Sequence, residues 1–172
     1  MERVFHTFPP VYGEHSRILI LGSFPSVKSR EEGFYYGHPR NRFWPLLAAL
    51  TGEAVPATVP EKQALLLRRG IALWDVAESC CIIGSRDNSI REITPVPIRE
   101  LLELSPIEAI FANGSTAWAL YMEYLYPVTQ MEAVKLPSTS PANAAVSSSR
   151  LQAAWEKALG PYLNDAGPAG NF

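Results

Sequence analysis

Cysteine is scarce in this sequence, with only Cys80 and Cys81 among 172 residues. Adjacent Cα atoms lie about 3.8 Å apart, below the usual disulfide spacing of about 4.4–6.8 Å. We therefore expect no structural bridge between these two thiols. Two cysteines are also too few to ligate an iron–sulfur cluster. The sequence is typical of a reduced, cytoplasmic protein.

Metal-ligand spacing, long apolar runs and excess positive charge are also missing. His6, His15 and His38 are scattered rather than spaced like zinc ligands, so we expect no metal and no other cofactor. No secretory signal is visible at the start, and no apolar run is long enough to span a membrane. The net charge of −2 argues against a protein held on nucleic acid by bulk charge alone, although a local basic groove remains open.

The composition that remains is that of an ordinary globular protein, with 47% hydrophobic and 19% charged residues. A chain of this length corresponds to one domain, which we place at residues 1–163. Residues 164–172 are expected to form a flexible C-terminal tail. We expect the protein to be a monomer.

Strand patterns alternate with helix patterns along the chain. Short apolar runs predict strands at residues 17–22, 71–76, 107–112 and 131–136. Helical spacing predicts helices at residues 41–50, 61–69, 97–104, 115–126 and 149–159. This order favours an α/β fold, a three-layer α/β/α sandwich around a mostly parallel four-stranded sheet.

Three long polar segments, residues 23–40, 77–94 and 137–149, are predicted as loops at the carboxyl ends of the strands, where such sheets bind ligands. Basic residues gather in and near the first and last of them, at Lys28, Arg30, Arg40, Arg42, Lys135 and Arg150. A basic edge on an acidic protein suits a phosphate backbone. Scattered solubilising charge is an equal alternative from composition alone.

Two motifs decide between these readings. The first is Gly22-Ser-Phe-Pro-Ser26, followed by Gly33-Phe-Tyr-Tyr-Gly-His-Pro-Arg-Asn-Arg-Phe-Trp44, and the second is Leu136-Pro-Ser-Thr-Ser-Pro-Ala-Asn143. Together they resemble the uracil-DNA glycosylase superfamily, and within it the hypoxanthine-DNA glycosylases, often called its sixth family. The resemblance covers residues 8–163 and implies the uracil-DNA glycosylase-like fold. It also implies that the second motif is the DNA-penetrating loop.

Departures from related branches bear on the substrate. Mismatch-specific uracil enzymes carry a water-activating Asn in the first motif, and single-strand-tolerant uracil enzymes carry an Asp in a comparable place. This sequence has Phe24 there, and its second motif lacks the His found in many relatives. Both differences imply poor activity on uracil.

Asn41 is the candidate catalytic residue. Its amide offers an acceptor and a donor for positioning water beside an oxocarbenium-like sugar, and it stays neutral. The resemblance implies the same role for the Asn of the Asn-Arg-Phe-Trp motif. The alternative is a cap for the helix that begins there, because Asn is a preferred cap residue, and the two roles can coexist.

Three residues are candidates for binding the base. The resemblance aligns Tyr36 with an aromatic that stacks on the extruded base, and Phe24 can form another wall of the pocket. Asn113 ends a strand and could match the C6 carbonyl and N1–H of hypoxanthine through its amide. An ordinary core aromatic and an Asn-Gly turn are the respective alternatives for Tyr36 and Asn113.

The remaining candidates concern DNA and the rim of the pocket. Asp75 could border the site, although a buried Asp75 that caps nearby backbone is equally consistent with the sequence. His38 is more simply structural than a base. We expect contacts to DNA from Arg40, Arg42, Ser138, Thr139, Ser140 and Asn143.

The sequence therefore predicts a monofunctional DNA glycosylase of base excision repair. It would flip a deaminated base, preferably hypoxanthine, out of DNA and leave an abasic site. The motifs contain no lysine that could act as a Schiff-base nucleophile, so we expect no strand cleavage. The alternatives are a uracil- or mispair-directed glycosylase and a lesion-binding module without catalysis. A small-molecule nucleotide-binding protein is disfavoured because no Gly-rich phosphate loop is present.

Overall fold

A parallel four-stranded sheet forms the centre of the computed structural model, which describes residues 2–163. The strand order is β3(Ile71–Asp75), β2(Ile18–Gly22), β6(Ala109–Asn113) and β7(Ala133–Leu136). This confirms the predicted sheet and places the four carboxyl ends along one edge. The tail predicted at residues 164–172 lies outside the described residues.

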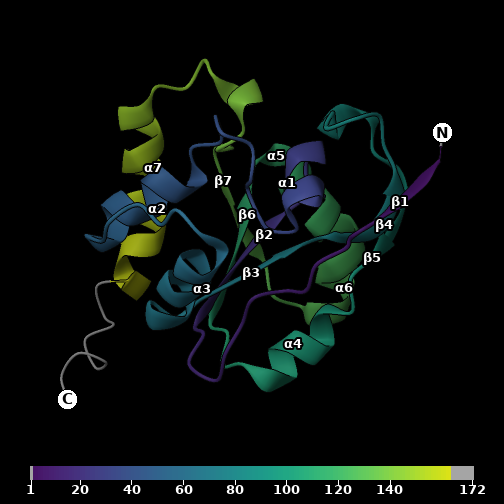
Figure 1. Cartoon of the computed structure of the whole chain (residues 1–172). Helices are drawn as coiled ribbons and strands as arrows, with labels where there is room; N and C mark the ends of the chain where they lie inside the picture. The colour runs from purple at the N-terminus through teal and green to yellow at the C-terminus, as the bar shows by residue number, and fades with distance from the viewer. Residues whose placement is uncertain (1, 164–172) are drawn as a thin grey trace.

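Helices cover both faces of the sheet and confirm the three-layer architecture (Figure 1). Along β2, Ile18 and Ile20 pack into one core while Leu19 and Leu21 pack into the other, as the alternation of a strand requires. The first core is closed by α2(Phe43–Thr51), α3(Val59–Arg68) and α7(Ser148–Leu163). The second is closed by α4(Ile98–Leu104), α5(Ser115–Leu120) and the turn that follows α5.

Local signals account for several helix ends. Thr58 caps α3 in a capping box with Glu61, and α2 ends at Gly52 in the left-handed conformation. The helix predicted at 115–126 does not stop at Pro127. It continues through a π-helical turn, Tyr121–Leu125, into α6(Tyr126–Thr129), because proline is tolerated in a first helical turn, where its missing N–H is not needed.

A second, antiparallel sheet was not predicted. The segment assigned as a polar loop at 77–94 contains β4(Ala77–Cys81) and β5(Arg91–Pro95), which pair with β1(Arg3–Phe5) in the order β1-β4-β5. The turn between β4 and β5 includes a short 3-10 helix, Asp87–Ser89. No clear strand pattern is visible in the sequence here because β4 contains Glu78 and Ser79, and its pairing with β5 is irregular. The cysteines of β4 are nevertheless buried, and neither forms a disulfide.

The first long loop is also more ordered than expected. Residues 23–40 include α1(Val27–Glu32), which begins after the cap residue Ser26 and ends at Gly33 in the left-handed conformation. The segment after β7 holds only a 3-10 turn, Pro141–Asn143. Within the described part of the chain, no helix is long and apolar enough to cross a membrane.

Candidate active site

A cavity of about 320 Å³ lies at the carboxyl edge of the parallel sheet. Its lining comes from segments that follow β2, β3, β6 and β7 together with the β4–β5 turn, so motifs far apart in sequence meet there. The predicted site residues that line it are Phe24, Tyr36, Asn41, Asn113, Ser138, Thr139 and Ser140. Arg40, Arg42 and Asn143 lie outside the lining.

The end of β2 forms one wall of the cavity. Gly22 lies opposite Asp75 in the sheet register, and a Cβ at this position would overlap the Asp75 carboxylate. Glycine is therefore required here by the close approach of the neighbouring strand's side chain. Phe24, only 7% exposed, packs into a third apolar core with Cys80 and presents part of its ring to the cavity.

Tyr36 occupies a strained position in the cavity wall. Its φ of 55° lies in the left-handed region, and its ring stacks on Phe43 with the centroids 4.2 Å apart. One ring face is therefore covered already, and stacking of a flipped base on the other face stays a prediction. Burial followed by the charge of Asp75 raises the pKa of the buried hydroxyl, against an opposing effect of the Asn113 side chain, so the phenol keeps its proton.

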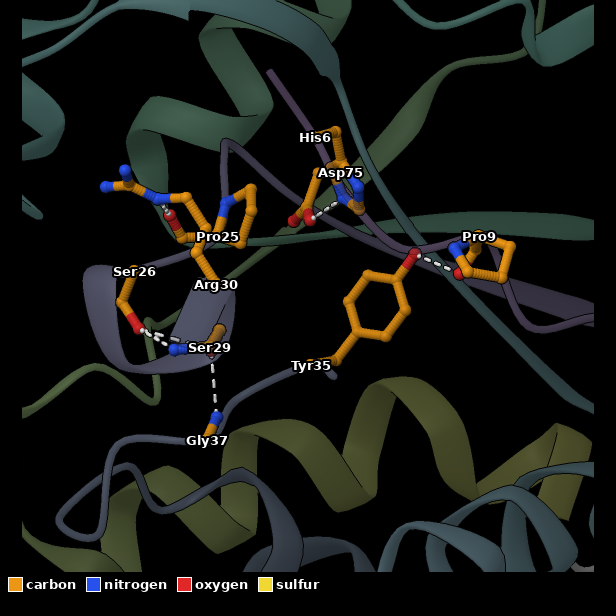
Figure 2. A network of polar contacts seen from close by, with 9 residues as sticks. All are labelled: His6, Pro9, Pro25, Ser26, Ser29, Arg30, Tyr35, Gly37 and Asp75. Atoms are coloured by element: carbon orange, nitrogen blue, oxygen red, sulfur yellow. Dashed lines mark hydrogen bonds and ion pairs between the residues drawn. The ribbon is translucent and has the colours of Figure 1, made fainter. Parts of the chain in front are cut away.

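Asp75 is paired with a histidine that the sequence gave no reason to single out. His6 Nε2 donates to Asp75 Oδ2 over 2.8 Å, and both side chains are only 4% exposed (Figure 2). The His6 ring is enclosed by aromatic rings, with centroids 4.5 Å from Phe8, 5.8 Å from Tyr35 and 6.3 Å from Phe24. No local signal could have found this pair, because its members lie 69 positions apart.

Serine hydroxyls fold the first motif around the cavity. Ser26 Oγ accepts the backbone N–H of Ser29 over 3.1 Å, and Ser29 Oγ accepts the N–H of Gly37 over 2.9 Å (Figure 2). The buried Ser29 therefore ties the start of α1 to the segment that carries Tyr36.

The β4–β5 turn closes the opposite side. Ser23 Oγ donates to Asp87 Oδ1 over 2.7 Å, and Ser85 Oγ accepts the N–H of Val27 over 2.9 Å. Desolvation raises the pKa of Asp87 and Asp75 adds to the rise, while the Ser23 hydrogen bond opposes it. These contacts bring Ser85 and Asp87 to the cavity, as the sequence suggested for this segment.

Asn41 lies just before α2 and lines the cavity. Its Oδ1 accepts the N–H of Phe43, the first residue of α2, over 2.9 Å, although the N-cap position itself is Arg42 and has no side-chain cap bond. Its Nδ2 has no hydrogen-bond partner among the described residues, and the half-buried side chain lines the cavity. The amide nitrogen is therefore available to a ligand while the oxygen holds the helix.

Asn113 and Thr139 bind each other. Asn113 Nδ2 donates to Thr139 Oγ1 over 3.0 Å, and Thr139 N–H donates to Asn113 Oδ1 over 3.0 Å. The Thr139 carbonyl accepts from the N–H of Arg42 over 3.0 Å. Thr139 is completely buried, so the expectation that its hydroxyl contacts a phosphate is corrected. Asn113 keeps one further lone pair on Oδ1 for a base, and its side chain also lies beside the Tyr36 hydroxyl.

Arg42 and Asn143 also act within the protein. The Arg42 guanidinium donates to the carbonyls of Val146 over 2.7 Å and Asn143 over 3.0 Å. Asn143 Nδ2 donates to the Ser138 carbonyl over 2.9 Å. These bonds secure the second motif against the start of α2, and they engage part of the polar groups that the sequence assigned to DNA.

The basic edge is thereby smaller than the sequence suggested. Arg30 donates to the carbonyls of Pro25 and Gly84, and Lys28 pairs with Glu31. Arg40 is exposed, and its guanidinium has no partner among the described residues. Arg40 is consequently the best placed cation of the first motif for a phosphate. No cluster of metal-ligating side chains occurs within residues 2–163.

Comparison with known proteins agrees with the motifs and the geometry. The family model described as the uracil DNA glycosylase superfamily matches residues 9–159. The chain belongs to this superfamily. It shares 36% identity over 151 residues with a protein of Methanosarcina acetivorans named hypoxanthine DNA glycosylase, covering 87% of this chain and 94% of that relative. A protein of the same name from Methanosarcina barkeri is 36% identical over 109 residues, covering 62% and 69% of the two chains.

The superfamily fold is also matched among solved structures. A solution NMR structure from Methanosarcina acetivorans, provisionally described as a uracil DNA glycosylase, gives a TM-score of 0.77 at 35% identity. The match covers 90% of this chain and 96% of that one. The sheet and the helices therefore match the fold of that protein.

Proposed function

We propose that this protein is a hypoxanthine-DNA glycosylase. It extrudes a deoxyinosine nucleotide from DNA and hydrolyses the bond between N9 of the base and C1′ of the sugar. The oxygen of water bonds to C1′, the electron pair of the broken bond leaves with the base, and the water proton is released to the base or to solvent. An abasic site remains, and no covalent enzyme intermediate is formed.

The observation that carries this proposal is the cavity, built from both motifs, in a chain 36% identical to proteins named hypoxanthine DNA glycosylase. A purine needs an enclosed site with apolar faces and a few polar groups, and Phe24, Tyr36 and Asn113 supply these types. Phe24 in the first motif has no group that could activate water. This favours hypoxanthine over uracil under the resemblance described above.

Asn41 is the proposed catalytic residue. Its unpartnered Nδ2 can donate a hydrogen bond to the attacking water or to the departing base. Because the side chain is neutral, it does not repel the phosphates of the DNA. Arg40 contacts the DNA backbone at the mouth of the site, with Ser138 and Ser140 beside the extruded nucleotide. We further propose that the protein acts as a cytoplasmic monomer with one glycosylase domain at residues 1–163.

The test is single-turnover base release from labelled duplexes that carry hypoxanthine, uracil or xanthine at one position. Alkali converts each abasic site into a strand break, and chromatography identifies the free base. We expect hypoxanthine to be released fastest and unmodified adenine to be retained. Strand breaks without alkali would contradict the monofunctional mechanism.

Two outcomes would overturn the proposal. Faster release of uracil than of hypoxanthine would make the protein a uracil-directed enzyme. Tight binding to hypoxanthine-containing DNA without release of any base would make it a lesion-binding module.

A further inference from the structure

We propose that Asp75, held in place by His6, recognises the N1–H of the flipped base and thereby distinguishes a deaminated base from its parent. Asp75 would be a specificity-determining residue and His6 a positioning residue. This inference rests on the proposed function, because it names the group that reads the base in the same site.

The two oxygens of Asp75 have different surroundings. Oδ2 accepts the hydrogen bond from His6, and Figure 2 shows the two side chains directed toward each other. Oδ1 lies beside Gly22, which also lines the cavity, and it has no hydrogen-bond partner among the described residues. One oxygen is therefore fixed by the protein, and the other is left for a ligand.

His6 is built to hold this orientation. A carboxylate can only accept, so the Nε2 atom of His6 carries the hydrogen. The surrounding Phe8, Tyr35 and Phe24 rings restrict rotation of the imidazole. Among the described residues, the side chain of His6 hydrogen-bonds only to Asp75 Oδ2, so we expect its polar effect on the substrate to pass through Asp75.

Depth in the cavity indicates which part of the nucleotide Asp75 meets. The Asp75 side chain is 4% exposed, whereas Asn41 is half-buried and lies where the second motif reaches α2. A flipped nucleotide enters such a pocket base first, with its sugar at the mouth. Asp75 thus faces the edge of the base, and Asn41 lies nearer to C1′ and the water.

A hydrogen-bond acceptor at this depth can distinguish a deaminated base from its parent base. Conversion of adenine to hypoxanthine turns N1 from an acceptor into an N–H donor, and conversion of cytosine to uracil does the same at N3. A carboxylate oxygen binds the N–H of the deaminated base but faces a lone pair in the parent base. A buried oxygen left without a donor is costly, so the parent base is disfavoured.

The experiment measures single-turnover release of hypoxanthine, 1-methylhypoxanthine and adenine, each placed opposite an abasic analogue so that no base pair must be broken. We expect the wild type to release hypoxanthine about 10- to 100-fold faster than 1-methylhypoxanthine, the range for loss of one hydrogen bond to a charged group. In Asp75→Asn, both this ratio and the preference over adenine should fall by a similar factor.

His6 is tested through the same ratios. His6→Phe keeps a ring but removes the donor, and it should lower the preference for hypoxanthine over 1-methylhypoxanthine. His6→Gln keeps an N–H and should restore part of that preference. Adding His6→Phe to Asp75→Asn should change the ratio no further, since the side chain of His6 hydrogen-bonds to Asp75 and to no other described residue. Glu103→Gln, which removes an exposed carboxylate of α4 outside the cavity lining, is the control and should leave the ratio as in the wild type.

Several results would overturn the inference. If the wild type releases hypoxanthine and 1-methylhypoxanthine at equal rates, the inference is refuted. This result needs only the wild type, so it holds even if Asp75→Asn does not fold. A uniform loss on all three substrates in Asp75→Asn, with unchanged ratios, would assign Asp75 to the chemical step instead. If the wild type releases no hypoxanthine, the proposed function fails. The affinities of the wild type for the hypoxanthine and 1-methylhypoxanthine duplexes, measured by fluorescence anisotropy, then decide the base-reading role separately.

Discussion

Replacing Asn41 by alanine and by aspartate separates its two roles. Alanine removes both the Oδ1 that accepts the N–H of Phe43 and the unpartnered Nδ2. Aspartate keeps an oxygen for the N–H of Phe43, but it replaces the donor by a second acceptor. If the amide nitrogen acts on the substrate, the two variants should differ in stability but should both release the base slowly.

The expected magnitudes are well separated. Loss of the hydrogen bond from Phe43 in Asn41→Ala costs about 1 kcal/mol, which lowers the melting temperature by roughly 2–4 °C for a chain of this size. Removal of one preorganised polar group from the reacting centre slows the chemical step by roughly 10²–10³-fold. A protein with an ordinary stability of about 5–15 kcal/mol stays folded after the smaller loss, so unfolding cannot produce the larger one.

The assay is single-turnover release of hypoxanthine at saturating enzyme, beside thermal melts and fluorescence anisotropy with the same DNA. We expect both variants to be slow, with Asn41→Asp melting as the wild type does and binding DNA less tightly because its charge repels phosphates. Full activity of a folded Asn41→Ala protein would move the catalytic role elsewhere. Full activity of Asn41→Asp would show that an oxygen suffices and would refute the role of Nδ2.

Four further predictions concern the walls of the site. Asn113→Ala should destabilise the protein by about 1–3 kcal/mol in denaturant titrations, because it leaves buried groups of the second motif unpaired; an unchanged midpoint would contradict this. Phe24→Asn should raise the ratio of uracil to hypoxanthine release in a folded variant, at a stability cost of roughly 3–5 kcal/mol typical for losing a buried aromatic ring. Arg40→Gln should reduce the slope of log affinity against log salt by about one unit, whereas Arg99→Gln, on α4, should not change it. Asp87→Asn should increase the free energy of unfolding at neutral pH, because a raised pKa means that the charged carboxylate is disfavoured in the folded state. That gain should disappear as the pH falls below the ordinary carboxyl range, and a gain independent of pH would argue against the raised pKa.

The parallel sheet could be predicted because its strands carry their signal locally. Residues 18–22 are buried on both faces, so the strand is a continuous apolar run, and β3 and β6 show the same pattern. The antiparallel sheet could not be predicted in this way. Its middle strand, β4, begins Ala-Glu-Ser, and it becomes a strand because β1 pairs with it from the far end of the chain.

The candidate site shows the same division. The motifs predicted which segments gather at the cavity, since each motif follows a strand of the parallel sheet. They did not predict which atoms stay available there. Arg42 and Thr139 have residue types suited to phosphate contact, but Arg42 donates to two backbone carbonyls and the Thr139 hydroxyl accepts from Asn113. Only the tertiary contact distinguishes them from Arg40, which has the same chemistry as Arg42 and a free guanidinium within the described residues.

Phe24 and Asp75 together bear on which base the cavity accepts. Within the first motif, Phe24 indicates only that a polar group is missing. In the fold, a carboxylate enters the same cavity from β3, the neighbouring strand, whose last residue lies opposite Gly22. Parallel strands end at one edge, so a group absent from the loop after one strand can be supplied from the end of the next without any change of topology. Substrate range in this superfamily should therefore follow the whole set of side chains at the strand ends more closely than the residue in one motif position.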